Sequence, residues 1–232
     1  MNTTTAIADT GLTIRPDEGT SEHLINDRLK KTNVLGLVLA GGLSTRMGQD
    51  KSLLCLRSTN QSLVEHAQNV LSSVCNGQVI VSGKGAEQLH DVYPDCGPLA
   101  GIHAGLAYAL KQRSVAGELD PAEQISAMLV TPVDMPNLTA RTIMLLIEKA
   151  QNNNNLAHFT GFNLPLYVPL HKSILQYLAS VLRDKKALSI YQLLKVNQGQ
   201  AIPIPHTVSV DEFVNVNSPE QWHKLNACST NT

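Results

Sequence analysis

The chain has 232 residues, of which 43% are hydrophobic and 4% aromatic, and its net charge is −1. This length and apolar content suit one α/β domain of ordinary size, and the near-neutral charge with few aromatic residues argues against a nucleic-acid-binding surface. No apolar run approaches the roughly 18 residues of a membrane span, and the N-terminus lacks the pattern of a secretory signal. We therefore expect a cytoplasmic protein that has neither a nucleic acid nor a membrane as a partner.

Residues 1–32 are polar and mixed, without a sustained hydrophobic period. They predict a disordered N-terminal tail ahead of a single domain that spans residues 33–228. The four cysteines show no metal-ligand spacing, which favours buried thiols in a reducing compartment.

The domain begins with the apolar run 34–39, which is too short for a helix and predicts a strand buried on both faces. The strand leads into a turn of three small residues: Ala40, Gly41 and Gly42. Such a turn exposes backbone N–H groups to an anion, and Arg46 and Lys51 add positive charge close by. The stretch predicts a cradle for a polyphosphate, although it matches neither the P-loop nor the G-x-G-x-x-G fingerprint. The alternative is a glycine-rich turn with incidental surface cations.

The next segments continue a βαβ pattern. Apolar residues recur at helical spacing over 61–74, and a β-branched strand is expected over 78–82. A loop with two aspartates, Asp91 and Asp95, precedes Gly97 and Pro98, and a helix of small and apolar residues follows over 99–110. Glycine and alanine at a helix start allow close approach of the backbone to a ligand.

Residues 127–131 predict another buried strand, which is followed closely by Asp134 between two prolines. An aspartate at the carboxyl end of a central strand points toward the ligand crevice of an open α/β sheet. A carboxylate there suits Mg²⁺, which commonly binds through one or two carboxylates and substrate phosphates. The alternative is that Asp134 begins a turn or caps the helix expected over 139–151.

The last third of the chain predicts an extended segment over 162–169 and helices over 173–182 and 187–196. The basic cluster 183–186 between the two helices could meet a substrate phosphate, or it could be a solvated helix end. Near the C-terminus, Ser218 and Gln221 form a capping-box pattern for a helix over 219–227. Capping leaves Asn215 and Asn217 unexplained.

Four blocks together resemble one family. They are L-A-G-G-x-S-x-R-M-G-x-D-K at 39–51, G-P-L-A-G at 97–101, V-D-M-P at 133–136 and N-V-N-S-P-E at 215–220. The first is similar to the signature of the nucleotidyltransferase superfamily, and the set most resembles molybdenum cofactor guanylyltransferases. The resemblance implies a three-layer α/β/α fold with a mostly parallel Rossmann-like sheet, of the nucleotide-diphosphosugar-transferase type. It also implies Mg²⁺-dependent transfer of GMP from GTP to molybdenum-molybdopterin, with molybdoenzymes or their chaperones as further partners.

The resemblance also implies roles for single residues. Leu39, Ala40, Gly41 and Gly42 would contact the nucleotide through the main chain, with Arg46 and Lys51 on its phosphates. Asp134 would hold Mg²⁺ and the nucleotide. Asp91, or else Asp95, would be a further nucleotide contact, and Ser82 stands where the family often has asparagine. Weaker expectations for the pterin substrate are Asn215, Asn217, Lys185 and Lys186.

Two alternatives remain open. A related nucleotidyltransferase could use CTP or act on a sugar or polyol phosphate, because the glycine loop is common to all of these enzymes. A non-catalytic nucleotide-binding or cofactor-binding protein is the alternative from another class.

Overall fold

The computed structural model describes residues 33–41, 54–116, 124–151 and 153–228. Its centre is a six-stranded sheet in the order β4-β1-β5-β7-β6-β8. The strands are β1 (Val34–Leu39), β4 (Val79–Ser82), β5 (Ala127–Pro132), β6 (Ala157–Phe159), β7 (Leu166–Pro169) and β8 (Gln200–Ile202). β1 is parallel to β4 and β5, β6 is parallel to β8, and β7 is antiparallel to both of its neighbours. The sheet is therefore mostly parallel, as expected.

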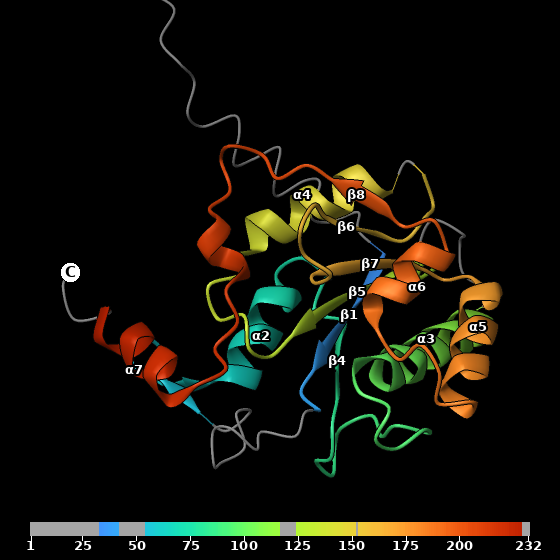
Figure 1. Cartoon of the computed structure of the whole chain (residues 1–232), viewed down its shortest axis with the longest axis horizontal. Coiled ribbons are helices and arrows are strands. Elements are labelled where there is room, and N and C mark those ends of the chain that lie inside the picture. Colours follow the sequence, from blue (N-terminus) through green and yellow to red (C-terminus); the bar gives the residue numbers. More distant parts are fainter. Residues whose placement is uncertain (1–32, 42–53, 117–123, 152, 229–232) are drawn as a thin grey trace, which may run out of the picture.

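Helices cover both faces of this sheet (Figure 1). The first face carries α2 (Leu63–Ser72) and α4 (Ala140–Ala150), and the second carries α3 (Pro98–Val115), α5 (Lys172–Arg183) and α6 (Ile190–Val196). β1 supplies both cores because side chains alternate along a strand, so Val34 and Val38 pack on the first face and Leu35 and Leu37 on the second. The expected three-layer α/β/α fold is confirmed.

Smaller elements surround the carboxyl edge of the parallel strands. A hairpin of β2 (Cys55–Leu56) and β3 (Gln61–Ser62) precedes α2. A 3-10 helix, η2 (Val210–Phe213), precedes α7 (Pro219–Cys228). At the start of α7, the amide of Gln221 donates to Ser218 Oγ and the amide of Ser218 donates to Gln221 Oε1, so the expected capping box is present. None of the described helices is long and apolar enough to cross a membrane.

Several boundaries differ from the sequence-based expectations. The helix expected over 99–110 extends to Val115, and the helix expected from 187 begins at Ile190 because the Ser189 side chain caps it. The extended segment 162–169 is a strand only from Leu166. β6, β8 and the hairpin were not predicted, since each of these strands has three residues or fewer and too little hydrophobic alternation to be recognised.

Helix α3 lies unusually close to the sheet. Gly101 and Gly105 are one helical turn apart, and a Cβ on either would come within 2.7 Å of side chains on β1 or β4. Gly97, with φ of +64°, turns the chain into this helix ahead of Pro98. The two glycines therefore let α3 begin directly against the end of the parallel strands, where the candidate site lies.

Candidate active site

The first part of the site is the end of β1. Ala40 N–H donates to Ser82 O at 2.9 Å, and Leu39 O accepts from Val133 N–H at 3.1 Å, so β1 is connected to the segments after both neighbouring strands. The Ala40 amide is therefore already engaged, which leaves its carbonyl and the exposed Gly41 as main-chain groups for a ligand. The predicted residues Gly42, Arg46 and Lys51 lie outside the described residues.

The second part joins β4 to the loop before α3. Ser82 is 2% exposed at the end of β4, and its Oγ donates to Asp91 Oδ1 at 3.1 Å. The pKa of the Asp91 carboxyl is raised, because partial burial outweighs the hydrogen bond from Ser82 and the charges of His90 and Lys84, which lower it. The structure thus brings together two predicted residues that are nine positions apart. Among the described residues, Asp95 makes no such hydrogen bond, so the geometry favours Asp91 of the two aspartates.

The third part is the loop after β5. Asp134 lies two residues beyond the strand, and its Oδ1 is buried. Thr139, not Asp134, caps α4, because the Thr139 side chain accepts from Thr142 N–H. The alternative that Asp134 caps the helix is therefore wrong, whereas Asp134 does lie in a turn, at the carboxyl edge of the sheet next to the end of β1.

The fourth part comes from the segment between η2 and α7. Val216 N–H donates to Asp134 O at 2.8 Å, which places the Asn215–Asn217 stretch against the Asp134 loop. Asn215 Oδ1 is buried and has no hydrogen-bond partner among the described residues. Asn217 is more exposed, and its backbone N–H donates to Gln221 Oε1. The block that the helix cap did not explain therefore lies beside the predicted metal ligand.

The basic cluster after α5 reaches the same edge. Leu182 O, at the end of α5, accepts from Cys96 Sγ at 3.8 Å, so the end of this helix lies beside the loop that leads into α3. Lys185 and Lys186 follow it and are exposed. Their backbone N–H groups complete the last turn of the helix, so a solvated helix end remains an adequate account of them.

The described residues suit Mg²⁺ better than a metal that needs a closed protein cage. They contain no group of three or more His, Cys, Asp or Glu side chains able to hold a metal ion. What they offer is the Asp134 carboxylate, on the loop after β5. A single hard oxygen donor fits an ion that takes its remaining ligands from phosphates and water.

Two residues that the sequence analysis missed contact the Asp134 loop. His66 Nε2 lies 2.9 Å from Pro136 O, and Glu212 Oε2 accepts from Thr139 Oγ1 at 2.7 Å. Each contact joins positions about 70 residues apart. Neither residue belongs to a motif, so only the fold could reveal them.

A glycine turn, a central-strand aspartate and polar side chains thus meet at the carboxyl edge of a mostly parallel sheet. This arrangement is typical of α/β proteins that bind a nucleotide at that edge.

Comparison with known proteins gives the family. The sequence profile of the MobA-like NTP transferase domain matches residues 36–201. A molybdenum cofactor guanylyltransferase from Xanthomonas euvesicatoria is 33% identical over 193 residues, which cover 82% of this chain and 93% of the relative. The chain therefore belongs to the MobA-like NTP transferase family and is a nucleotidyltransferase.

Solved structures agree on the fold. A putative protein from Aquifex aeolicus is 21% identical with a TM-score of 0.60, and the alignment covers 81% of this chain and 95% of that one. A 2-C-methyl-D-erythritol 4-phosphate cytidylyltransferase from Thermus thermophilus is 15% identical with a TM-score of 0.53, covering 84% of this chain and 98% of that one.

Proposed function

We propose that this protein transfers GMP from GTP to molybdenum-molybdopterin, forming molybdopterin guanine dinucleotide and pyrophosphate. The Xanthomonas relative is named molybdenum cofactor guanylyltransferase, which supports this proposal. The observation that carries the proposal is the 2.8 Å hydrogen bond from Val216 N–H to Asp134 O. It joins the loop proposed for the metal and nucleotide to the segment proposed for the second substrate, as a transfer between two bound phosphates requires.

On the nucleotide side, Asp91 is the group that could prefer guanine. Guanine offers N–H donors at N1 and at its exocyclic N2, whereas a carboxylate is an acceptor pair. Ser82 donates to Asp91 Oδ1 and so fixes one carboxylate oxygen. Ser82 itself reaches less far than the asparagine that the family often has, so we assign base contact to Asp91 and orientation to Ser82.

On the chemical side, a phosphate oxygen of the pterin substrate forms a bond to the α-phosphorus of GTP. The bond from that phosphorus to the bridging oxygen breaks, and pyrophosphate leaves with the electron pair. Mg²⁺ held at Asp134 would supply charge neutralisation for the phosphates. Arg46, Lys51 and the amides of Gly41 and Gly42 would stabilise charge on the α-phosphate and the leaving group, in a mechanism that depends on positioning and electrostatics.

On the pterin side, we assign Asn215 and Asn217 to the second substrate, with Lys185 and Lys186 near its phosphate. The buried Asn215 Oδ1 supports this, because a buried amide oxygen without a partner is costly unless a ligand completes it. Delivery of the product to molybdoenzymes or their chaperones would follow from the same activity.

A second candidate is a cytidylyltransferase, which the fold of the Thermus enzyme keeps open. The two are separated by calorimetric titration of the full chain with GTP, CTP, ATP and UTP, each with Mg²⁺. We expect GTP to bind most tightly and Asp91→Asn to reduce that preference. A turnover assay with molybdopterin as acceptor then tests the reaction itself. A preference for CTP would leave the assignment as a nucleotidyltransferase unchanged, but the proposed product would then contain cytidine in place of guanosine. Absence of binding by all four nucleotides would refute the proposed site.

A further inference from the structure

The loop that carries Asp134 is attached to the rest of the site at both ends. At its start, Val133 N–H and Asp134 O bond to the end of β1 and to Val216. Where the loop enters α4, both the amide and the hydroxyl of Thr139 donate to Glu212 Oε2, at 3.0 and 2.7 Å. These contacts all come from the side of β1 and η2. They leave the middle of the loop to be supported from elsewhere.

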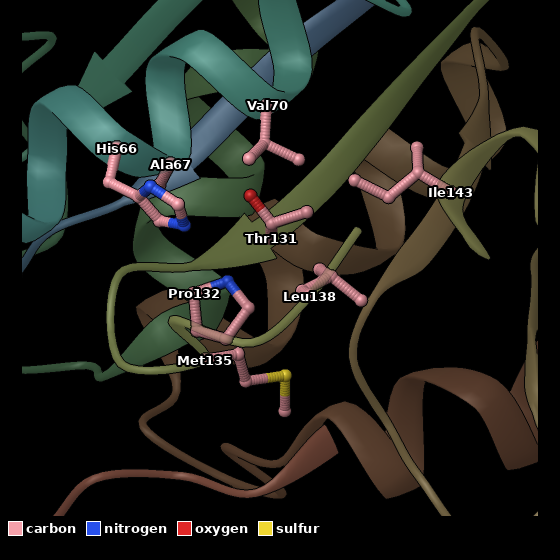
Figure 2. Close-up of a pocket in the computed structure, with 8 residues that line it drawn as sticks. All are labelled: His66, Ala67, Val70, Thr131, Pro132, Met135, Leu138 and Ile143. Atoms are coloured by element: carbon pink, nitrogen blue, oxygen red, sulfur yellow. The ribbon is translucent and has the colours of Figure 1, made fainter. Parts of the chain in front are cut away.

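That support comes from His66 on α2. Its Nε2 lies 2.9 Å from Pro136 O, two residues beyond Asp134. A carbonyl oxygen can only accept, so Nε2 must carry the proton and donate. The ring is part-buried and projects from a helix that packs against β1 and β4, so its position is set by the core and not by the loop. Figure 2 shows the His66 ring pointing from α2 toward Thr131 and Pro132 at the end of β5, where the loop begins.

Packing holds the loop in part, because Val133, Met135 and Leu138 are buried in the same hydrophobic core as residues of α2. The packing beneath the loop is nonetheless incomplete. A cavity of about 10 Å³, close to the volume that one water molecule needs, lies beneath it. Thr131 Oγ1, also in the lining, is buried and has no hydrogen-bond partner among the described residues. Helix α2 lines the cavity with His66, Ala67 and Val70 (Figure 2). The hydrogen bond from His66 therefore adds to this packing a directional contact that holds Pro136 O at a defined distance from α2.

We propose that His66 is a positioning residue for the metal ligand: by holding Pro136 O, it sets where the Asp134 carboxylate meets Mg²⁺ and the nucleotide phosphates. The inference rests on the role proposed above for Asp134. It adds a residue of α2 to the site without contact between that residue and either substrate. Loss of one neutral hydrogen bond of this kind should weaken the dependent equilibrium by roughly threefold to tenfold.

The test compares variants of the full chain in calorimetric titrations of GTP at a series of Mg²⁺ concentrations. His66→Leu removes the N–H donor, and His66→Asn leaves a side chain too short for its amide to reach Pro136 O. His66→Gln retains an N–H donor at the end of a side chain of similar length. Val70→Ala is the matched control, because it enlarges the same cavity from the same helix but has no polar contact with the loop. Thermal unfolding of each variant measures the structural cost separately.

We expect His66→Leu and His66→Asn to raise the Mg²⁺ concentration for half-maximal GTP binding by about threefold to tenfold, and His66→Gln to recover most of it. Val70→Ala should lower the unfolding temperature and leave the Mg²⁺ dependence unchanged. The inference would be overturned if His66→Leu or His66→Asn folds and shows the Mg²⁺ dependence of the wild type. An equal shift in Val70→Ala would overturn it as well.

Asp134→Ala separates this inference from the proposed function. It should abolish the Mg²⁺ dependence of GTP binding. If it does so while the His66 variants behave as wild type, only the positioning role fails. If Asp134→Ala keeps the wild-type dependence, the metal assignment itself fails and the positioning role fails with it.

Discussion

Replacing Gly101 by alanine tests whether the close approach of α3 to the sheet serves the nucleotide site. The new Cβ would lie 2.6 Å from Ser82 Oγ and 2.7 Å from Leu39 Cδ2. Both distances are far shorter than an ordinary carbon contact, so something must shift. Ser82 is 2% exposed and its hydroxyl is committed to Asp91. It can give way only by breaking that hydrogen bond.

The expected loss of stability in Gly101→Ala follows from two destabilising effects and one stabilising effect. Overpacking of a core costs about 1–3 kcal/mol. A broken hydrogen bond costs about 1 kcal/mol. Alanine in place of glycine inside a helix stabilises the folded state by about 1 kcal/mol. We therefore expect Gly101→Ala to lose about 1–3 kcal/mol of stability, a fall in unfolding temperature of roughly 2–12 °C for a domain of this size.

Gly105→Ala is the matched control, because it lies one turn further along the same face of α3. Its Cβ would lie 2.7 Å from Leu37 Cδ2 and 2.9 Å from Met128 Sδ, which are the ends of flexible side chains. It has the same gain in helix propensity and does not touch Ser82 or Asp91.

Differential scanning calorimetry and titration with GTP decide the matter. Gly101→Ala should weaken GTP binding by roughly threefold to tenfold, as expected when Asp91 loses its oriented hydrogen bond, and Gly105→Ala should bind GTP as wild type does. Equal GTP affinity in both variants and the wild type would refute the link between α3 packing and the nucleotide site. An equal loss in both variants would show that the effect is a general one of strained packing.

Two further predictions follow. Asp134→Ala and Lys51→Ala should fold with nearly unchanged unfolding temperature yet lose about 10²–10³-fold in turnover, because each removes one electrostatic partner of the reacting phosphates; turnover near wild type in either variant would exclude the role given to that residue. Burial lowers the pKa of His103 from its usual 6.5. As pH falls, the unfolded chain therefore binds a proton on this histidine before the folded protein does. The stability that the neutral histidine contributes is complete above about pH 6.5 and is lost as pH falls toward the folded-state pKa. Urea unfolding at pH 7.5 and 5.5 should therefore show a smaller loss for His103→Phe than for wild type, and equal losses would contradict the sign.

The elements that the sequence predicted well are those whose pattern is local. β1, β4 and β5 are short, almost uninterrupted apolar runs, and α2 repeats its buried positions at helical spacing. The capping box at Ser218 and Gln221 is a four-residue signal and was confirmed. Each of these features depends on residues within a few positions of one another, so no knowledge of the fold was required.

The features that could not be predicted join distant segments. β7 reverses the direction of the sheet between β5 and β6, and nothing in its four residues indicates an antiparallel partner. The sequence nominated Ser82 and Asp91 separately but did not predict the hydrogen bond between them. His66 lies in α2 like any other half-buried residue of an amphipathic helix, and its contact with Pro136 depends on how α2 and β5 are placed by the sheet.

The strand order explains why Asp134 occupies the centre of the proposed site. On one side of β5, the parallel strands β1 and β4 end at the main-chain turn and at Ser82, which are proposed for the nucleotide. On the other side, the antiparallel β7 begins the second half of the sheet, and the segment between η2 and α7, which follows that half in the chain, carries Asn215 and Asn217, proposed for the second substrate. β5 is therefore the strand at which the two halves meet. A carboxylate placed just beyond its end would lie between the phosphates of the two proposed substrates, which is the position that a metal-assisted transfer between them requires.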